Sequence, residues 1–149
     1  MEKITFTNEI DASVEKVWDT LFGTETYPQW TVVFTEGSAV ETDWKKGSKA
    51  LFTDGKGNGM VSEIAESIPN EFMSIKHLGE LKDGKETFPE GWEASFENYE
   101  LKEKAGKTEL TVSMDTNKEW KEYFENVWPK AIEKIKEIAQ GTRKYHVET

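Results

Sequence analysis

The chain has 149 residues, of which 36% are hydrophobic and 12% aromatic, enough for one domain with a sizeable buried core. It carries 19 basic and 29 acidic residues, a formal charge of −10, and its single arginine is Arg143, so it lacks the basic surface that nucleic acids and anionic membranes require. The absence of cysteine excludes disulfides, cysteine-ligated zinc, iron–sulfur clusters and thiol nucleophiles, and it suits a reducing compartment.

The N-terminal segment lacks the long apolar stretch of a signal peptide, and no apolar run is long enough to span a bilayer. We therefore expect a cytoplasmic protein with no membrane insertion and no nucleic-acid partner. We expect residues 1–140 to form a single domain. Residues 141–149, which begin at a helix-ending Gly141, are expected to form a polar C-terminal tail.

An alternating apolar pattern over residues 4–10 predicts a strand with one buried face, and a helix follows directly. Ser13 is placed to cap this helix and Gly23 to end it. Because Pro28 disfavours helical geometry at the residue before it, the segment 27–30 is expected to close a second, brief helix. The apolar face of the first helix consists of Val14, Val17, Trp18, Leu21 and Phe22.

Turn-rich segments then separate a series of short apolar runs, which is the pattern of an antiparallel meander. The glycine-rich segment 54–59 and the segment 68–70 are expected turns, and Asp83-Gly84 is expected to form a hairpin turn. The strands are expected at residues 50–53, 60–64, 72–78, 92–101 and 110–114.

The strand expected at residues 92–101 changes phase along its length. One face would carry Trp92, Ala94 and Phe96, and the other Tyr99 and Leu101. A β-bulge near Glu97-Asn98 would reconcile the two patterns by bending the strand, and bent strands make a sheet concave. The alternative is a regular strand on which one aromatic pair is partly exposed.

The last third of the chain has apolar residues at the spacing that places them on one face of a helix. Because Pro129 removes a backbone hydrogen bond, we expect a bend between Asn126 and Lys130. The alternative is two consecutive helices, with Pro129 in the first turn of the second. The aromatic half of this stripe is expected to line open space and the aliphatic half to seal against the sheet. The stripe consists of Trp120, Tyr123, Phe124, Val127, Trp128, Ala131, Ile132, Ile135 and Ile138.

The order of these elements resembles the START-like, Bet v 1-like (SRPBCC) superfamily, and within it the single-domain bacterial proteins similar to the activator of Hsp90 ATPase (AHSA1). The similarity is carried by residues 17–21, 27–30 and 68–79, by Trp92-Glu93, and by residues 96–101. These are packing and turn motifs, so they specify a fold rather than a reaction. The resemblance implies an α+β helix-grip fold: a curved antiparallel sheet wraps around a long C-terminal helix, and two short helices follow the first strand.

The same resemblance implies an apolar cavity between the long helix and the sheet, and aromatic rings lining such a cavity suit apolar ligands. We therefore expect the protein to bind a small hydrophobic or aromatic molecule, with no cofactor and no metal. The alternative is that the same side chains fill the space themselves. The residues expected to line the cavity are Trp30, Phe52, His77, Trp92, Tyr99, Met114, Trp120, Phe124 and Trp128.

Catalytic signals are sparse, and no catalytic residue is assigned. The only histidines are His77 and His146, which excludes a multi-histidine metal site, and no G-x-S-x-G motif supplies a nucleophilic serine. A hydrogen-bonded structural role for His77 competes with an acid–base role. An enzyme of the cyclase or hydrolase type stays an alternative, with His77 and Glu97 as its acid–base groups.

A partnership with an Hsp90-type chaperone is suggested by the family name alone. The chain is too short to hold the separate N-terminal domain through which eukaryotic activators stimulate that chaperone. We therefore rank a chaperone partner last among the expected functions, after ligand binding and catalysis.

Overall fold

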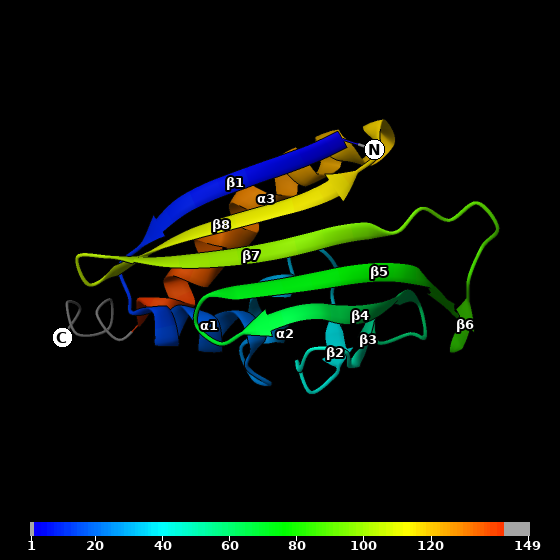
Figure 1. Ribbon diagram of the computed structural model, residues 1–149, viewed down its shortest axis with the longest axis horizontal. Coiled ribbons are helices and arrows are strands. Elements are labelled where there is room, and N and C mark those ends of the chain that lie inside the picture. The colour runs from blue at the N-terminus through cyan, green and yellow to red at the C-terminus, as the bar shows by residue number, and fades with distance from the viewer. Residues whose placement is uncertain (1, 142–149) are drawn as a thin grey trace.

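The computed structural model describes residues 2–141, and its strands form one curved antiparallel sheet (Figure 1). The strands are β1 (Glu2–Ile10), β2 (Ala39–Glu41), β3 (Lys49–Thr53), β4 (Gly59–Ile68), β5 (Phe72–Lys82), β6 (Lys85–Thr87), β7 (Ser95–Lys104) and β8 (Lys107–Thr116). This eight-stranded sheet has the order β1-β8-β7-β5-β4-β3-β2, and β6 pairs with β5. The antiparallel meander that the turn pattern predicts is therefore confirmed, with two additional short strands, β2 and β6.

The helices are α1 (Val14–Phe22), α2 (Tyr27–Thr31) and α3 (Lys118–Ala139). Figure 1 shows α3 running along one face of the sheet, with its C-terminal end close to α1. We call the face that α3 covers the inner face. This arrangement is the predicted α+β helix-grip fold. None of the helices in the described part of the chain combines the length and the hydropathy needed to cross a bilayer.

The first short helix, α1, begins and ends at its predicted caps, Ser13 and Gly23. The Ser13 side chain accepts a hydrogen bond from the backbone N–H of Lys16 at 3.2 Å, which confirms the predicted cap of α1. The prediction for the second helix is wrong in one respect, because the segment 27–30 begins α2 instead of closing it. Pro28 lies in the first turn of α2, where its missing N–H is not needed and its fixed φ favours the helix.

The predicted β-bulge near Glu97-Asn98 is wrong. Pairing of β7 with β5 and with β8 continues without interruption through these residues, and the register shifts lie between β4 and β5 instead. The change of phase arises because β7 begins only at Ser95, which leaves Trp92 in the preceding loop. Phe96 points to the outer face and is 37% exposed, so the alternative of a partly exposed aromatic on a regular strand is correct.

The turn between β5 and β6 confirms the predicted hairpin at Asp83-Gly84. Both residues have positive φ values, 50° and 78°, and Lys82 pairs directly with Lys85 across them. Two successive residues with positive φ are the signature of the tight turn whose twist matches that of an antiparallel hairpin.

The terminal helix α3 is continuous, so the alternative of two consecutive helices separated at Pro129 is wrong. Asn117 caps its N-terminus, since the Asn117 side chain accepts a hydrogen bond from the backbone N–H of Trp120 at 3.0 Å. The polar tail expected at residues 141–149 lies, apart from Gly141, outside the described residues.

Candidate functional site

The inner face of the sheet is closed at one end and accessible at the other. On β5 the exposed fraction rises from 0% at Met73 and 1% at Ile75 to 13% for the side chain of His77. On β7 it rises from 2% at Tyr99 to 25% for the side chain of Glu97. Because β5 and β7 are antiparallel neighbours in the register that pairs Ile75 with Glu97, the two strands become accessible at the same end.

The terminal helix shows the same gradient. Ile135 is 0% exposed and Trp128 2%, whereas Phe124 is only partly buried and Trp120 is 51% exposed. The aliphatic half of the stripe thus seals against the core as expected, and in the aromatic half Trp128 is buried with it, whereas Phe124 and Trp120 are not. We call the region around His77 and Glu97, together with the N-terminal half of α3, the accessible end.

Four polar side chains form one hydrogen-bonded chain at the accessible end. Ser62 Oγ lies 2.7 Å from Nδ1 of His77, and Nε2 of His77 donates to Glu97 Oε1 at 3.1 Å. The Tyr99 hydroxyl donates to the other carboxylate oxygen, Oε2 of Glu97. We call Ser62, His77, Glu97 and Tyr99 the polar cluster. Both nitrogens of the imidazole and both oxygens of the carboxylate take part in it.

Strand register brings these residues together. His77 on β5 lies directly opposite Ser62 on β4, and opposite Ser95 on β7. Glu97 is two residues along β7 from Ser95 and therefore lies on the same face, diagonally across from His77. Diagonal neighbours on an antiparallel pair are within reach of long side chains, which explains the contact between imidazole and carboxylate.

In the cluster and at its neighbour Tyr27, the pKa values shift in opposite directions. Burial raises the pKa of Glu97, but the hydrogen bond and charge attraction from His77, together with the hydrogen bond from Tyr99, outweigh it and hold that pKa below its ordinary value. Burial raises the pKa of both Tyr99 and Tyr27, and the charge of Glu97 raises both further. The site therefore combines a charged carboxylate with two neutral phenols.

Aromatic rings surround the polar cluster. Phe52 on β3 meets the ring of His77 edge-on, with centroids 5.9 Å apart, and Tyr27 lies 6.3 Å from Phe52 and 5.5 Å from Trp30. The indole of Trp92 donates from Nε1 to the backbone carbonyl of His77 at 3.1 Å, which ties the loop before β7 to β5. Aromatic rings thus lie beside the His77 end of the polar cluster.

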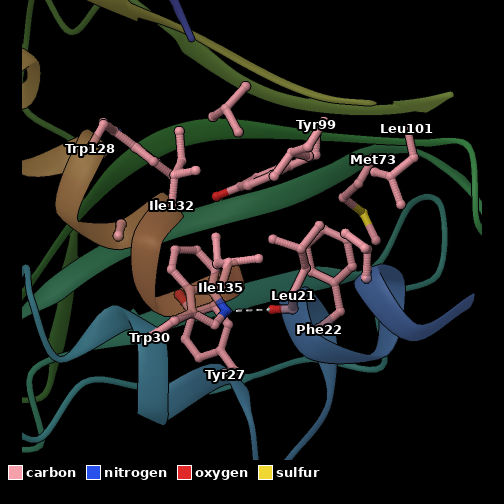
Figure 2. Packing of buried hydrophobic residues seen from close by; sticks show 14 of the residues in the cluster. Leu21, Phe22, Tyr27, Trp30, Met73, Tyr99, Leu101, Trp128, Ile132 and Ile135 are labelled. Carbon is pink, nitrogen blue, oxygen red and sulfur yellow. Dashed lines mark hydrogen bonds between the residues drawn. The ribbon is translucent and has the colours of Figure 1, made fainter. Parts of the chain in front are cut away.

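The residues predicted to line a cavity divide into two sets. Trp30, Tyr99, Met114 and Trp128 are at most 6% exposed and pack directly on one another, with 5.9 Å between the rings of Trp30 and Trp128. Figure 2 shows Trp30 and Tyr27 beside Leu21, with the Trp30 indole bonded to the Leu21 carbonyl at 3.1 Å. The packing of these four buried residues is the one given by the alternative, in which the side chains themselves fill the space between the helix and the sheet.

The second set keeps accessible surface. It consists of Phe52, His77, Trp92, Trp120 and Phe124, all of them partly or largely exposed. Contact between any of the nine residues and a ligand stays a prediction. Within residues 2–141 no group of three or more histidine, aspartate or glutamate side chains is arranged to hold a metal ion.

Sequence reasoning missed two residues of the site. Ser62 lies on β4 in phase with Met60 and Ile64, and a polar residue on an otherwise apolar face is a signal that could have been used. Tyr27 is expected from the sequence only as part of a brief helix, and not as a residue of the interior. Glu97 was considered only as an acid–base alternative, although it is in phase with the buried Tyr99.

Comparison with known proteins identifies the architecture. A profile of the family described as "Activator of Hsp90 ATPase homolog 1-like protein" matches residues 11–140. The crystal structure of MLL2253 from Mesorhizobium loti superposes with a TM-score of 0.72 at 16% identity, covering 95% of this chain and 98% of that chain. The Aha1 dimer from Colwellia psychrerythraea gives a TM-score of 0.72 at 18% identity, covering 92% of this chain and 95% of that chain.

CalU16 from Micromonospora echinospora is also similar, with a TM-score of 0.68 at 17% identity, covering 93% of this chain and 74% of that chain. At such low identities these likenesses establish the fold alone. No sequence among the curated proteins matches this chain significantly.

Proposed function

The chain belongs to the activator of Hsp90 ATPase homologue 1-like family, and we propose that it binds a small hydrophobic or aromatic molecule between the sheet and the N-terminal half of α3. One observation carries this proposal: burial falls in step along β5, β7 and α3 towards the accessible end. A domain that needed nothing beyond a filled core would bury this end as completely as it buries Met73 and Ile135.

In this proposal the partly exposed rings of Phe52, Trp92 and Phe124 supply apolar contact area. Glu97 and His77 orient one polar group of the ligand, since a few placed polar groups in an apolar site fix orientation. We also propose a cytoplasmic location, which the cysteine-free composition suits.

The test is a ligand screen followed by two matched substitutions. Thermal-shift measurements across lipids, sterols and aromatic compounds, with native mass spectrometry of the purified protein, would identify a binder. Phe124→Ala removes a ring at the accessible end and is expected to weaken binding by about tenfold. Phe96→Ala removes the same ring from the outer face of β7 and is expected to leave binding unchanged. The proposal would be contradicted if no compound shifted the melting temperature and none co-purified with the protein. Equal losses of binding affinity in the two variants would also contradict it.

A second candidate, an acid–base enzyme using the same site, is favoured by the hydrogen bonds that join Ser62, His77, Glu97 and Tyr99. Ser62 is 1% exposed, so its hydroxyl is not available as a nucleophile, and the group positioned to exchange a proton with a bound molecule is Glu97. Mass spectrometry of the bound compound after incubation would reveal a product. The expected product would be lost in Glu97→Gln and His77→Ala, and recovery of the compound unchanged from the unmodified protein would exclude this candidate.

A further inference from the structure

We infer that the ligand of the accessible end is a small aromatic or alkyl amine, bound with its protonated nitrogen against the carboxylate of Glu97. This inference rests on the proposed function and adds the chemical class of the ligand. It is argued from the charge of the site, from the free acceptor positions of the carboxylate, and from the rings around it.

The first step concerns the charge of the site. The cross-strand neighbours of Glu97 are Ile75 on β5 and Met114 on β8, and both are buried and apolar. Among the described residues no lysine or arginine pairs with this carboxylate, and the imidazole of His77 is its hydrogen-bonded neighbour. A carboxylate facing the interior favours a compensating cation, and His77 divides its hydrogen bonds between Glu97 and Ser62.

The second step concerns hydrogen-bonding capacity. An ionised carboxylate offers about four acceptor positions and no donor. His77 and Tyr99 each occupy one of these positions on Glu97, and 25% of the side chain stays accessible. A ligand group that meets the free positions must therefore donate, and a charged donor such as an ammonium bonds more strongly than a neutral hydroxyl.

The third step concerns the surrounding rings. Tyr27 and Phe52 lie close to the polar cluster, and the pKa of the Tyr27 phenol is raised first by burial and further by the charge of Glu97. Aromatic faces attract organic cations through their quadrupoles, and they also provide apolar area for the ligand body. A carboxylate among aromatic rings is complementary to an amine with an apolar body.

The charge of the whole chain points the same way. With a formal charge of −10 the protein raises the local concentration of cations around it and repels anions. A fatty acid or a phosphate would place a second negative charge beside Glu97 without a lysine or arginine among the described residues paired with Glu97 to offset it. The site therefore discriminates against anionic ligands of similar size and shape.

The experiment compares three probes that share a phenyl ring and a short chain but differ in charge: phenethylamine, phenethyl alcohol and hydrocinnamate. Isothermal titration calorimetry on the full chain at neutral pH is expected to give an affinity for phenethylamine about tenfold higher than for phenethyl alcohol, with hydrocinnamate weakest. Glu97→Gln is expected to remove the preference for the amine while keeping the binding of the alcohol. Glu100→Gln, the same change on the outer face of β7, is expected to leave the preference intact.

The outcomes separate the two proposals. Equal affinities for amine and alcohol, or tighter binding of hydrocinnamate, would overturn the inference and leave the proposed function standing. Failure of all three probes together with a silent ligand screen would overturn both. The comparison of probes on the unmodified protein needs no variant, so it decides the matter even where circular dichroism finds Glu97→Gln unfolded.

Discussion

The two halves of α3 bury their apolar side chains to different degrees although they belong to one helix. Ala131, Ile132 and Ile135 in the C-terminal half are at most 2% exposed, whereas Trp120 and Tyr123 in the N-terminal half are 51% and 38% exposed. The larger of these side chains, the rings of Trp120 and Tyr123, are thus on the half that is less buried. This reverses what packing alone would give, because aromatic side chains gain the most from burial.

The side chains of the sheet also differ between the closed region and the accessible end. The closed half lies over a fully apolar core, where burial and stability coincide. At the accessible end β5 and β7 carry an imidazole and a charged carboxylate, which cannot be covered by hydrocarbon without losing the access to water that Glu97 retains. Stability is therefore expected to concentrate at the closed half, and ligand recognition at the accessible end.

The difference between the two halves of α3 is tested most directly by truncating one side chain in each half and comparing the losses of stability. Ile135→Ala deletes a side chain that is 0% exposed and is expected to lower the free energy of unfolding by about 2–5 kcal/mol, through lost transfer energy and the cavity that remains. Trp120→Ala removes a side chain that is 51% exposed and is expected to cost no more than about 1 kcal/mol. Urea titrations monitored by circular dichroism measure both, and similar losses would remove the division between the halves.

A second substitution tests the boundary between the two halves of α3, which lies at Pro129. Pro129 follows Trp128, the last largely buried ring before the helix becomes accessible, and it removes one backbone hydrogen bond from α3. Pro129→Ala is expected to raise the free energy of unfolding by about 1–3 kcal/mol, because alanine restores the donor and favours the helix. If the proline also directs Phe124 towards the ligand, binding will weaken while stability rises. Denaturant titration and calorimetry on the same variant separate the two effects, and a loss of stability would contradict the expectation.

Much of the fold could be predicted because it depends on local chemistry. The cap at Ser13, the turn at Asp83-Gly84 and the apolar stripe of α3 each follow from residues close together in the sequence. The strand order in the meander follows from successive turns. The family resemblance supplied the remaining step, the wrapping of the sheet around α3.

The polar cluster could not be predicted because it depends on pairing between strands. Ser62, His77 and Glu97 come from three strands, and their contact depends on a register that includes two shifts between β4 and β5. A one-residue change in that register would move a side chain to the opposite face. The local phase change in β7 was a real signal, but it marked the start of the strand at Ser95 and not a bulge.

The smallest expected effect tests how far the closed region extends. Burial raises the pKa of Tyr27 and Tyr99 above the ordinary value of 10.0, with the charge of Glu97 adding to the rise. Their contribution to stability is therefore fully present below pH 10 and is lost as the pH rises from there towards the raised values, since the unfolded state releases its protons first. Each buried phenol is expected to lower the free energy of unfolding by up to about 1.4 kcal/mol per pH unit in that range.

Tyr27→Phe removes one of these two contributions, so denaturant titrations at several alkaline pH values are expected to give a shallower fall in stability than in the unmodified protein. Between pH 7 and 9 both proteins should show no tyrosine-linked change, because folded and unfolded phenols are then both protonated. An unchanged alkaline slope in Tyr27→Phe would mean that water already reaches this phenol in the folded state. The accessible end would then include Tyr27, and the boundary of the closed region would lie within α2, between Tyr27 and the buried ring of Trp30.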